Sequence, residues 1–245
     1  RNNTGQHEMI CTVKIRYKVN LGSDIMKKIG HRGVRGIKPE NTLESILEAV
    51  NLGFDMAEID IQMTKDGKII VFHDYDLKRL FNSNKKISEL TYEELLTITD
   101  EIPLLKEVIK NIKDKNMELN IEIKELFQKN GIIEELIYLL ERYSFKEKVL
   151  ISSFDHVILK EIKKRDKMLK TAVLVASRPA DPVSVIKAAE ADGYNSLYYF
   201  MDKEIISECH KHGYFVNIWT VNTKAEAEYY KNMGVDGIIS DYNLF

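Results

Sequence analysis

Residues 57–72, AEIDIQMTKDGKIIVF, decide how the strands of this chain are counted. Apolar and polar residues alternate across Ala57–Ile61, the pattern of a strand with one buried face. Asp66-Gly67 is a strong signal for a tight hairpin turn, and Ile69–Phe72 follows it. We therefore predict that Ile69–Phe72 pairs antiparallel with Ala57–Ile61 and is not an independent strand of a parallel sheet.

Eight other strand-like runs, separated by helical patterns, remain when the hairpin return is set aside. They are Lys27–Gly30, Ala57–Ile61, Glu118–Ile123, Val149–Ser152, Thr171–Val175, Ser196–Tyr199, Tyr214–Val221 and Asp236–Ser240. Alternation of strands and helices predicts a parallel sheet with helical crossovers. Eight such units in about 220 residues favour a TIM (β/α)8 barrel over an open sheet.

The helical patterns between the runs place apolar residues on one face. Two examples follow the spacing i, i+3, i+4, i+7, namely Leu43, Ile46, Leu47 and Val50, and Leu105, Val108, Ile109 and Ile112. Asn41 stands three residues before Glu44, so we predict that the pair forms a capping box at the start of the first helix.

Composition excludes several classes of protein. The 245 residues include 36 Lys and Arg against 38 Asp and Glu, a net charge of −2, so the basic surplus needed for nonspecific nucleic-acid binding is absent. No apolar run approaches the roughly 18 residues of a membrane-spanning helix. Cys11 and Cys209 have no metal or redox spacing, and two lone thiols favour a reducing, cytoplasmic location.

The sequence divides into a short N-terminal part and one long domain. We predict an extension over residues 1–25, either an extra strand or a segment added for expression, and one barrel domain over residues 26–245. Residues 75–101 interrupt the barrel pattern and are predicted to form a small insertion above its mouth, after the hairpin.

Charged residues follow several of the predicted strands, at the end where TIM barrels carry their active sites. They are His31 and Arg32, then Glu58 and Asp60, then His73, then Glu122 and Lys124. If Asp66 and Gly67 are the two central residues of the turn, Asp60 lies opposite His73 with Cβ atoms about 5 Å apart. The hairpin would then bring His73 beside the acidic pair.

Three carboxylates without a neighbouring cysteine favour a hard cation. Glu58, Asp60 and Glu122 offer only oxygen, which suits Mg²⁺ or Ca²⁺ better than Zn²⁺. The competing interpretation of paired acids on a strand is a solvated face, but the alternating Ile59 and Ile61 favour an acidic face directed into the mouth. The remaining histidines are predicted to be ordinary hydrogen-bonded or surface residues: His7, His156, His210 and His212.

The ordered set of motifs resembles the glycerophosphodiester phosphodiesterase family, from about residue 29 to residue 241. The N-terminal motifs are His31-Arg32-Gly33, Pro39-Glu40-Asn41-Thr42, Glu58-x-Asp60, Thr64-x-Asp66-Gly67 and His73-Asp74. The C-terminal motifs are Asn120-x-Glu122-x-Lys124, Ser152-Ser153-Phe154, Trp219-Thr220-Val221-Asn222 and Asp236-Gly237-Ile238.

The resemblance implies an enzyme that hydrolyses glycerophosphodiesters to an alcohol and glycerol 3-phosphate through a cyclic phosphate. It implies a divalent metal held by Glu58, Asp60 and Glu122, and phosphate binding by Arg32 and Lys124. His31 and His73 would be the catalytic pair, with His31 assigned as base and His73 as acid. Trp219 is expected either to contact the glycerol carbons or to pack in the core.

Residues 75–81, YDLKRLF, depart from the family pattern, which usually has a Thr-Thr pair and a glycine-rich stretch there.

Two alternative functions remain open. A lysophospholipase D would need an apolar rim, which Leu77, Leu80 and Phe81 could supply. A noncatalytic phosphoester-binding barrel would be indicated by loss of a histidine or a carboxylate, and none is lost. The sequence leaves the choice of metal, the leaving alcohol and the oligomeric state open.

Overall fold

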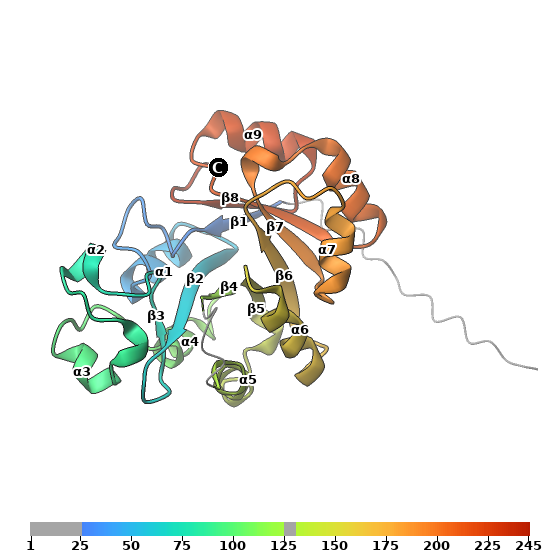
Figure 1. Ribbon diagram of the computed structural model, residues 1–245. Coiled ribbons are helices and arrows are strands. Elements are labelled where there is room, and N and C mark those ends of the chain that lie inside the picture. Colours follow the sequence, from blue (N-terminus) through green and yellow to red (C-terminus); the bar gives the residue numbers. More distant parts are fainter. Residues whose placement is uncertain (1–25, 125–130) are drawn as a thin grey trace, which may run out of the picture.

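A computed structural model of the chain describes residues 26–124 and 131–245. In these residues eight parallel strands lie side by side in the order β1-β9-β8-β7-β6-β5-β4-β2, and pairing of β1 with β2 closes the barrel (Figure 1). The strands are β1 (Lys27–Gly30), β2 (Met56–Met63), β4 (Glu118–Ile123), β5 (Val149–Ser153), β6 (Lys170–Val175), β7 (Gly193–Leu197), β8 (Phe215–Trp219) and β9 (Gly237–Ser240). The predicted TIM barrel is confirmed.

Helices cover the outside of the barrel (Figure 1). Those in the crossovers are α1 (Leu43–Asn51), α4 (Leu105–Ile112), α5 (Ile132–Arg142), α6 (His156–Arg165), α7 (Pro182–Ala188), α8 (Lys203–Lys211) and α9 (Lys224–Met233). Short 3-10 turns precede β5 and follow β7, η2 (Lys146–Lys148) and η3 (Tyr198–Phe200). The sequence placed the sixth barrel strand, β7, two to three residues too late, because the strand begins at Gly193 and Tyr198 already belongs to η3.

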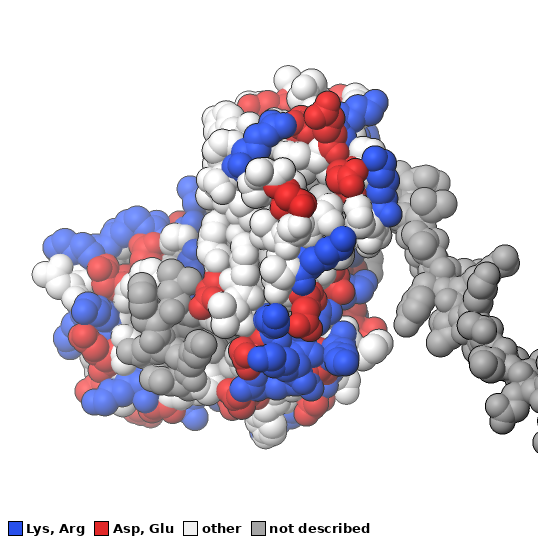
Figure 2. All heavy atoms as spheres, turned by 45° about the vertical axis from the view of Figure 1, so that its right-hand side comes forward, with Lys and Arg blue, Asp and Glu red and all other residues white. Residues whose placement is uncertain are grey.

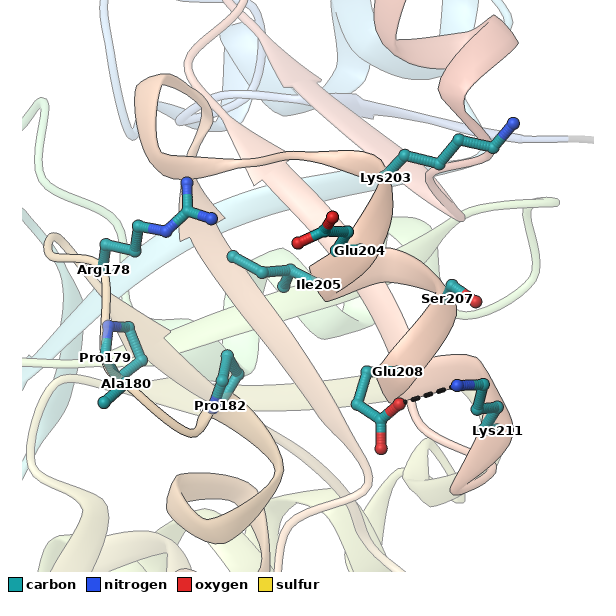
Figure 3. A pocket seen from close by; sticks show the side chains of 10 residues that line it. All are labelled: Arg178, Pro179, Ala180, Pro182, Lys203, Glu204, Ile205, Ser207, Glu208 and Lys211. Carbon is teal, nitrogen blue, oxygen red and sulfur yellow. Dashed lines mark hydrogen bonds and ion pairs between the residues drawn. The ribbon is translucent and has the colours of Figure 1, made fainter.

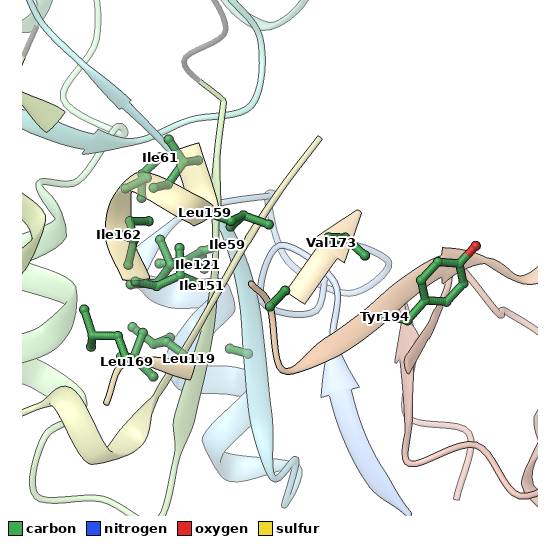
Figure 4. Packing of buried hydrophobic residues seen from close by; sticks show 14 of the residues in the cluster. Ile59, Ile61, Leu119, Ile121, Ile151, Leu159, Ile162, Leu169, Val173 and Tyr194 are labelled. Atoms are coloured by element: carbon green, nitrogen blue, oxygen red, sulfur yellow. The ribbon is translucent and has the colours of Figure 1, made fainter. Parts of the chain in front are cut away.

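The main hydrophobic core lies between the strands and these helices. Ile59, Ile121 and Ile151 point outward from three neighbouring strands and pack with Leu159 and Ile162 of α6 (Figure 4). All five side chains are almost completely buried. Since apolar burial is the dominant favourable term in folding, this outer layer holds the barrel in shape and leaves the inward faces of the strands available for polar residues.

The hairpin forms as predicted, but its register is one residue different. β3 (Ile69–Val71) pairs antiparallel with β2, and Ile61 lies opposite Val71. The backbone N–H of Thr64 donates to the carbonyl of Lys68, while Gly67 adopts the left-handed conformation at φ +78°. The loop therefore has three residues instead of two, and Asp60 lies opposite Phe72, not His73. The predicted pairing of Asp60 with His73 is wrong by one position.

The segment between β3 and α4 builds a second, smaller core. It contains α2 (Lys78–Phe81), η1 (Ile87–Glu89) and α3 (Tyr92–Leu96), whose apolar side chains pack with Ile70 and Phe72 of the hairpin return. Leu77 is fully buried and the ring of Phe81 lies 6.1 Å from that of Phe72. These two residues therefore do not form the expected apolar rim, and only Leu80 of the three is exposed.

The surface carries both signs of charge on the face seen in Figure 2, as the near-zero net charge leads one to expect. None of the helices in residues 26–124 and 131–245 is long and apolar enough to cross a membrane.

The predicted extension over residues 1–25, with His7 and Cys11, lies outside the described residues. Cys209 is buried and forms no disulfide with any described residue.

Candidate active site

Strand β2 carries the acidic pair on its inward face. Ala57, Ile59 and Ile61 belong to the outer core, so the alternation of the strand turns Glu58 and Asp60 into the barrel. Glu58 is 4% exposed and Asp60 is 1% exposed. This burial rules out the solvated face as the explanation of the pair.

The inward carboxylates of β2 meet a third from the neighbouring strand. Asp60 lies beside Glu122 in the parallel register of β2 and β4, and oxygen atoms of Glu58, Asp60 and Glu122 lie within 4.8 Å of one another. Burial and the neighbouring negative charges raise the pKa of Glu58 well above its ordinary value and that of Glu122 to about 7. Such crowding of carboxylate oxygens is the arrangement that a hard divalent cation stabilises.

Two cations border this cluster. Lys124 Nζ lies 2.6 Å from Glu122 Oε1 and 3.4 Å from Asp60 Oδ1, and Arg32 Nε lies 3.4 Å from Asp60 Oδ2. Burial alone would raise the pKa of Asp60, but the charges of Lys124 and Arg32 outweigh it and lower that pKa. Asp60 is thus held ionised between the other two acids.

Asn41 supports the cluster and does not cap α1. Its amide donates to Asp60 Oδ2 at 2.8 Å and its carbonyl oxygen accepts from the Asp60 backbone N–H at 3.1 Å. Thr42 is the residue that caps α1, through a hydrogen bond that its hydroxyl accepts from the Ser45 backbone N–H. The predicted Asn41 cap is therefore wrong by one residue, because the Asn41 side chain is engaged by a strand distant in sequence.

The loop after β1 positions His31 and Arg32. Gly33 has φ +85°, and a Cβ there would lie 2.4 Å from Ser45 Oγ, so the close approach of this loop to α1 requires glycine. The Arg32 backbone N–H donates to Glu58 at 2.9 Å, which ties the loop to the acidic cluster. The sharp turn thereby presents both side chains at the mouth.

His31 is held by a carboxylate from the other end of the chain. Its Nδ1 lies 2.6 Å from Asp241 Oδ1, and Asp241 also accepts from Asn222 at 2.8 Å. Burial opposes ionisation of Asp241, but the hydrogen bonds from His31 and Asn222 outweigh it and lower its pKa. The ionised Asp241 fixes the ring and leaves Nε2 facing Glu58 at 4.0 Å.

His73 has a similar arrangement. Its Nδ1 lies 2.6 Å from Oδ1 of the adjacent Asp74. Burial lowers the pKa of His73, and the nearby charges of Lys124 and Arg32 lower it further, although Asp60 and Asp74 oppose them. Although the register differs from the prediction, His73 still reaches the mouth, because β3 has ended at Val71 and the chain turns there.

A cavity of about 120 Å³ at the mouth brings the predicted residues together. It is lined by His31, Arg32, Glu58, His73, Glu122, Lys124 and Trp219, whereas Asp60 contacts Lys124 and Arg32 beside it. The Trp219 indole packs edge-on against Phe154, with ring centroids 5.7 Å apart, and its N–H donates to the Asn195 carbonyl. Trp219 therefore both contacts the core and forms an apolar wall of the cavity.

A larger hollow of about 870 Å³ lies elsewhere, between the loop after β6 and helix α8 (Figure 3). Three of the charged side chains that line it are paired, Arg178 with Asp202 and Glu208 with Lys211. None of the predicted site residues lines it. The remaining described histidines do not line the mouth cavity, since His156 bonds the Leu174 carbonyl, His210 bonds Asp236 and His212 bonds Glu208.

Sequence reasoning missed the partners of the histidines. Asp241 lies 210 positions from His31 along the chain, and no local pattern marks it. Glu40 and Asn120 were quoted only as parts of motifs, yet Glu40 accepts from Arg32 at 2.7 Å and Asn120 lines the cavity. Glu40 lies in the loop after β1 and Asn120 lies within β4, and this placement in or after a strand was the one available signal.

Comparison with known proteins agrees with this geometry. The model of the glycerophosphoryl diester phosphodiesterase family matches residues 31–243. A glycerophosphodiester phosphodiesterase of Caldanaerobacter subterraneus is 36% identical over 225 residues, which cover 87% of this chain and 93% of that protein. A lysophospholipase D of Homo sapiens is 27% identical over 267 residues, which cover 89% of this chain and 84% of that protein.

A solved structure extends the likeness to the fold. The phosphodiesterase of Oleispira antarctica in complex with the product sn-glycerol-3-phosphate superimposes with a TM-score of 0.81 at 26% identity, over 89% of this chain and 94% of that one. With a family model that matches nearly all of the barrel and a close relative over the same span, the chain belongs to the glycerophosphoryl diester phosphodiesterase family and is an enzyme of that class.

Proposed function

We propose that this chain hydrolyses glycerophosphodiesters to an alcohol and glycerol 3-phosphate, using a divalent cation and the histidines His31 and His73. The observation that carries the proposal is that both histidines line one cavity, each with Nδ1 on a carboxylate, beside an acidic cluster and two cations. The product named for the Oleispira relative supports the choice of substrate.

The residues present fit a divalent cation. Glu58, Asp60 and Glu122 would hold it through oxygen, and burial together with the neighbouring carboxylates keeps the pKa values of Glu58 and Glu122 raised even though Lys124 and Arg32 lie beside them. Oxygen ligands alone favour Mg²⁺ or Ca²⁺. When bound, the cation would supply charge stabilisation for the non-bridging phosphate oxygens.

The side chains of the cavity would bind and orient the phosphate. Asn120 Nδ2 is a buried donor without a hydrogen-bond partner among the described residues, Arg32 Nε has only its 3.4 Å ion pair with Asp60, and both residues line the cavity. A phosphate oxygen is the acceptor such donors require, and Arg32 and Lys124 would add charge. Trp219 and Phe154 form the apolar wall against which glycerol carbons would lie.

The two histidines would move the two protons. The sequence assigned His31 as base and His73 as acid, whereas the lowered pKa of His73 supports the reverse. A histidine held neutral accepts a proton from the attacking hydroxyl more readily than it donates one. His31, fixed against the ionised Asp241, would then protonate the leaving alcohol.

We further propose that the nucleophile is the glycerol hydroxyl next to the phosphate. Its oxygen forms a bond to phosphorus as the bond to the leaving alcohol breaks, and water then opens the cyclic phosphate. Intramolecular attack gains effective molarities of about 10⁵ M or more. A substrate built on propane-1,3-diol lacks that hydroxyl, so its kcat should fall strongly with little change in KM. Comparable kcat on both substrates would instead mean direct attack by water.

The decisive test of the activity is a panel of glycerophosphodiesters with metal-free enzyme. Protein treated with EDTA is assayed for release of glycerol 3-phosphate before and after addition of Mg²⁺ or Ca²⁺. We expect activity only after the metal is restored. Full activity of the metal-free protein would contradict the metal site, and absence of glycerol 3-phosphate under every condition would contradict the function.

A second candidate is a lysophospholipase D activity. Phe154 is 42% exposed beside Trp219, so the wall of the cavity extends apolar surface toward solvent. The similarity to the human lysophospholipase D also supports this candidate activity. If acyl chains bind there, kcat/KM should rise when a glycerophosphodiester carries a long acyl chain, and Phe154→Ala should remove the preference.

A further inference from the structure

Helix α2 of the insertion carries an arginine that bridges two loops of the active site. Arg79 Nε donates to Asp74 Oδ2 at 2.6 Å, and its Nη2 and Nη1 donate to the two oxygens of Glu40 at 2.5 and 3.1 Å. The two carboxylates belong to segments 34 positions apart, one after β1 and one after β3. A planar guanidinium is suited to hold two carboxylates at a fixed angle.

Each of these carboxylates in turn holds a side chain of the cavity. Asp74 uses its other oxygen, Oδ1, to accept from Nδ1 of His73 at 2.6 Å. Glu40 Oε1 accepts from Arg32 Nη1 at 2.7 Å. Arg79 itself does not line the cavity. It therefore lies at the centre of a chain of ionic hydrogen bonds that runs from His73 to Arg32.

We propose that Arg79 is a positioning residue that sets the ring of His73 through Asp74 and the guanidinium of Arg32 through Glu40. The proposal rests on the proposed function, which gives His73 and Arg32 their roles. It also assigns a task to the insertion, in the segment 75–81 where the sequence departs from the family pattern.

The surroundings of Arg79 separate its task from a general contribution to stability. The side chain is 45% exposed, and exposed ion pairs contribute about 0–1 kcal/mol to folding. Its backbone is nevertheless held in place, because the preceding Leu77 is fully buried in the core of the insertion and Phe81 packs on Phe72. A guanidinium anchored in this way imposes a position on its two carboxylates at small cost to folding.

The two branches predict separable kinetic effects. Loss of the Asp74 branch misplaces the proton-transferring ring, so Asp74→Asn should lower kcat. Loss of the Glu40 branch frees the phosphate-binding guanidinium, so Glu40→Gln should mainly raise KM. Arg79→Ala should do both, with kcat/KM down about tenfold or more, the scale seen when partners of active-site ligands are removed. Arg79→Lys keeps the positive charge but cannot bond both carboxylates as the planar guanidinium does, so it should recover only part of the lost kcat/KM.

The matched control is Arg165→Ala. Arg165 also bridges two carboxylates, Glu134 and Glu161, with similar exposure, but it ends α6, which runs away from the mouth. We expect the two alanine variants to have similar melting temperatures, and only Arg79→Ala to lose activity. Guanidinium ion added to Arg79→Ala should restore part of kcat, and it should leave Arg165→Ala unchanged. Equal kcat/KM in the two variants would overturn the proposal.

A readout independent of turnover keeps the test separate from the proposed function. The ¹⁵N chemical shifts of the His73 ring, assigned by their absence in His73→Gln, report which nitrogen carries the proton. We expect protonated Nδ1 in the wild type and a mixture of tautomers in Arg79→Ala. Unchanged shifts in Arg79→Ala would overturn the Asp74 branch even if the enzyme is active. A wild type that hydrolyses no glycerophosphodiester, with altered shifts in the variant, would contradict the function and leave the positioning contact supported.

Discussion

Two layers of side chains inside the barrel differ sharply, although strand β2 contributes to both. The lower layer is apolar and contains Ile29, Met56, Leu150 and Ala172, while Ile239 of the same cluster reaches the cavity at the mouth. The layer above it carries the three carboxylates with Arg32 and Lys124. On β2 the change from one to the other takes two residues, from Met56 to Glu58. One face of β2 is thus apolar at one end and carries the proposed metal ligands at the other.

The difference shows how the fold can tolerate buried charge. Three carboxylates taken out of water oppose folding unless cations and hydrogen bonds satisfy them. The apolar layer and the outer core provide burial that is independent of the charged layer. Changes in the upper layer should therefore act mainly on activity and those in the lower layer on stability, and the predictions for the acidic cluster, the histidines and Met56 test this separation.

The largest effect is expected at the acidic cluster. Glu58→Ala, Asp60→Ala or Glu122→Ala should abolish activity, with a loss of about 10³-fold or more, since a bound metal contributes several kcal/mol to the transition state. Circular dichroism should show an intact fold. Steady-state kinetics with saturating Mg²⁺ measure the loss, and a variant that retains most of its activity would remove that carboxylate from the metal site.

The second largest effect is expected at the two histidines that line the cavity. His31→Ala and His73→Ala should each cost about 10²-fold or more on alkyl esters. A p-nitrophenyl ester leaves without protonation, so the variant that lacks the acid should recover on this substrate. We expect that recovery for His31→Ala and not for His73→Ala. Recovery of His73→Ala alone would restore the assignment made from the sequence, with His31 as base and His73 as acid. If either alanine variant loses less than threefold in activity, the histidine it replaces has no catalytic role.

The lower layer should respond in the opposite way. Met56 is 3% exposed beneath Glu58, and Met56→Ala should lower the free energy of unfolding by about 2–5 kcal/mol. Its kcat should remain within about twofold of the wild type where the variant is folded. Met168→Ala, at a side chain 81% exposed, is the control that should change neither quantity. Chemical denaturation and kinetics on the same samples check the comparison.

The smallest effect concerns pH. Glu122 has a pKa raised from 4.5 to about 7 by burial and the nearby Asp60, so the folded state binds more protons than the unfolded state in this window. The stability of the metal-free protein contributed by Glu122 should therefore fall as pH rises from about 4.5 to about 7. Mg²⁺ should reduce the fall. In Glu122→Gln the melting temperature should decline less over this window, and an identical decline in both proteins would contradict the shift.

The sequence predicted the barrel and the residues of the upper layer because both leave local signals. Strand alternation marked Glu58 and Asp60, and the Asp66-Gly67 turn showed that one run belongs to a hairpin. The hairpin register escaped prediction because Gly67 closes a three-residue loop, which the dipeptide alone does not distinguish from a two-residue one.

The partners of the site residues could not be predicted in the same way. Asn41 has the spacing of a helix cap, but its side chain bonds Asp60, a contact that exists only once α1 lies against β2. Arg79 occurs in a stretch without periodicity and meets Glu40 and Asp74 through the packing of the insertion. Such contacts depend on tertiary geometry and not on local pattern.

The pairing of β1 with β9, together with the bond from His31 to Asp241, has a consequence for the timing of synthesis. A ribosome makes His31 early and Asp241 210 residues later, and at about 5–20 residues per second the delay is about 10–40 s. During that interval His31 lacks its partner Asp241 and the barrel lacks β9, the strand that closes it. Catalysis would therefore switch on in a single late event, and turnover by ribosome-bound chains of increasing length would report the moment of closure.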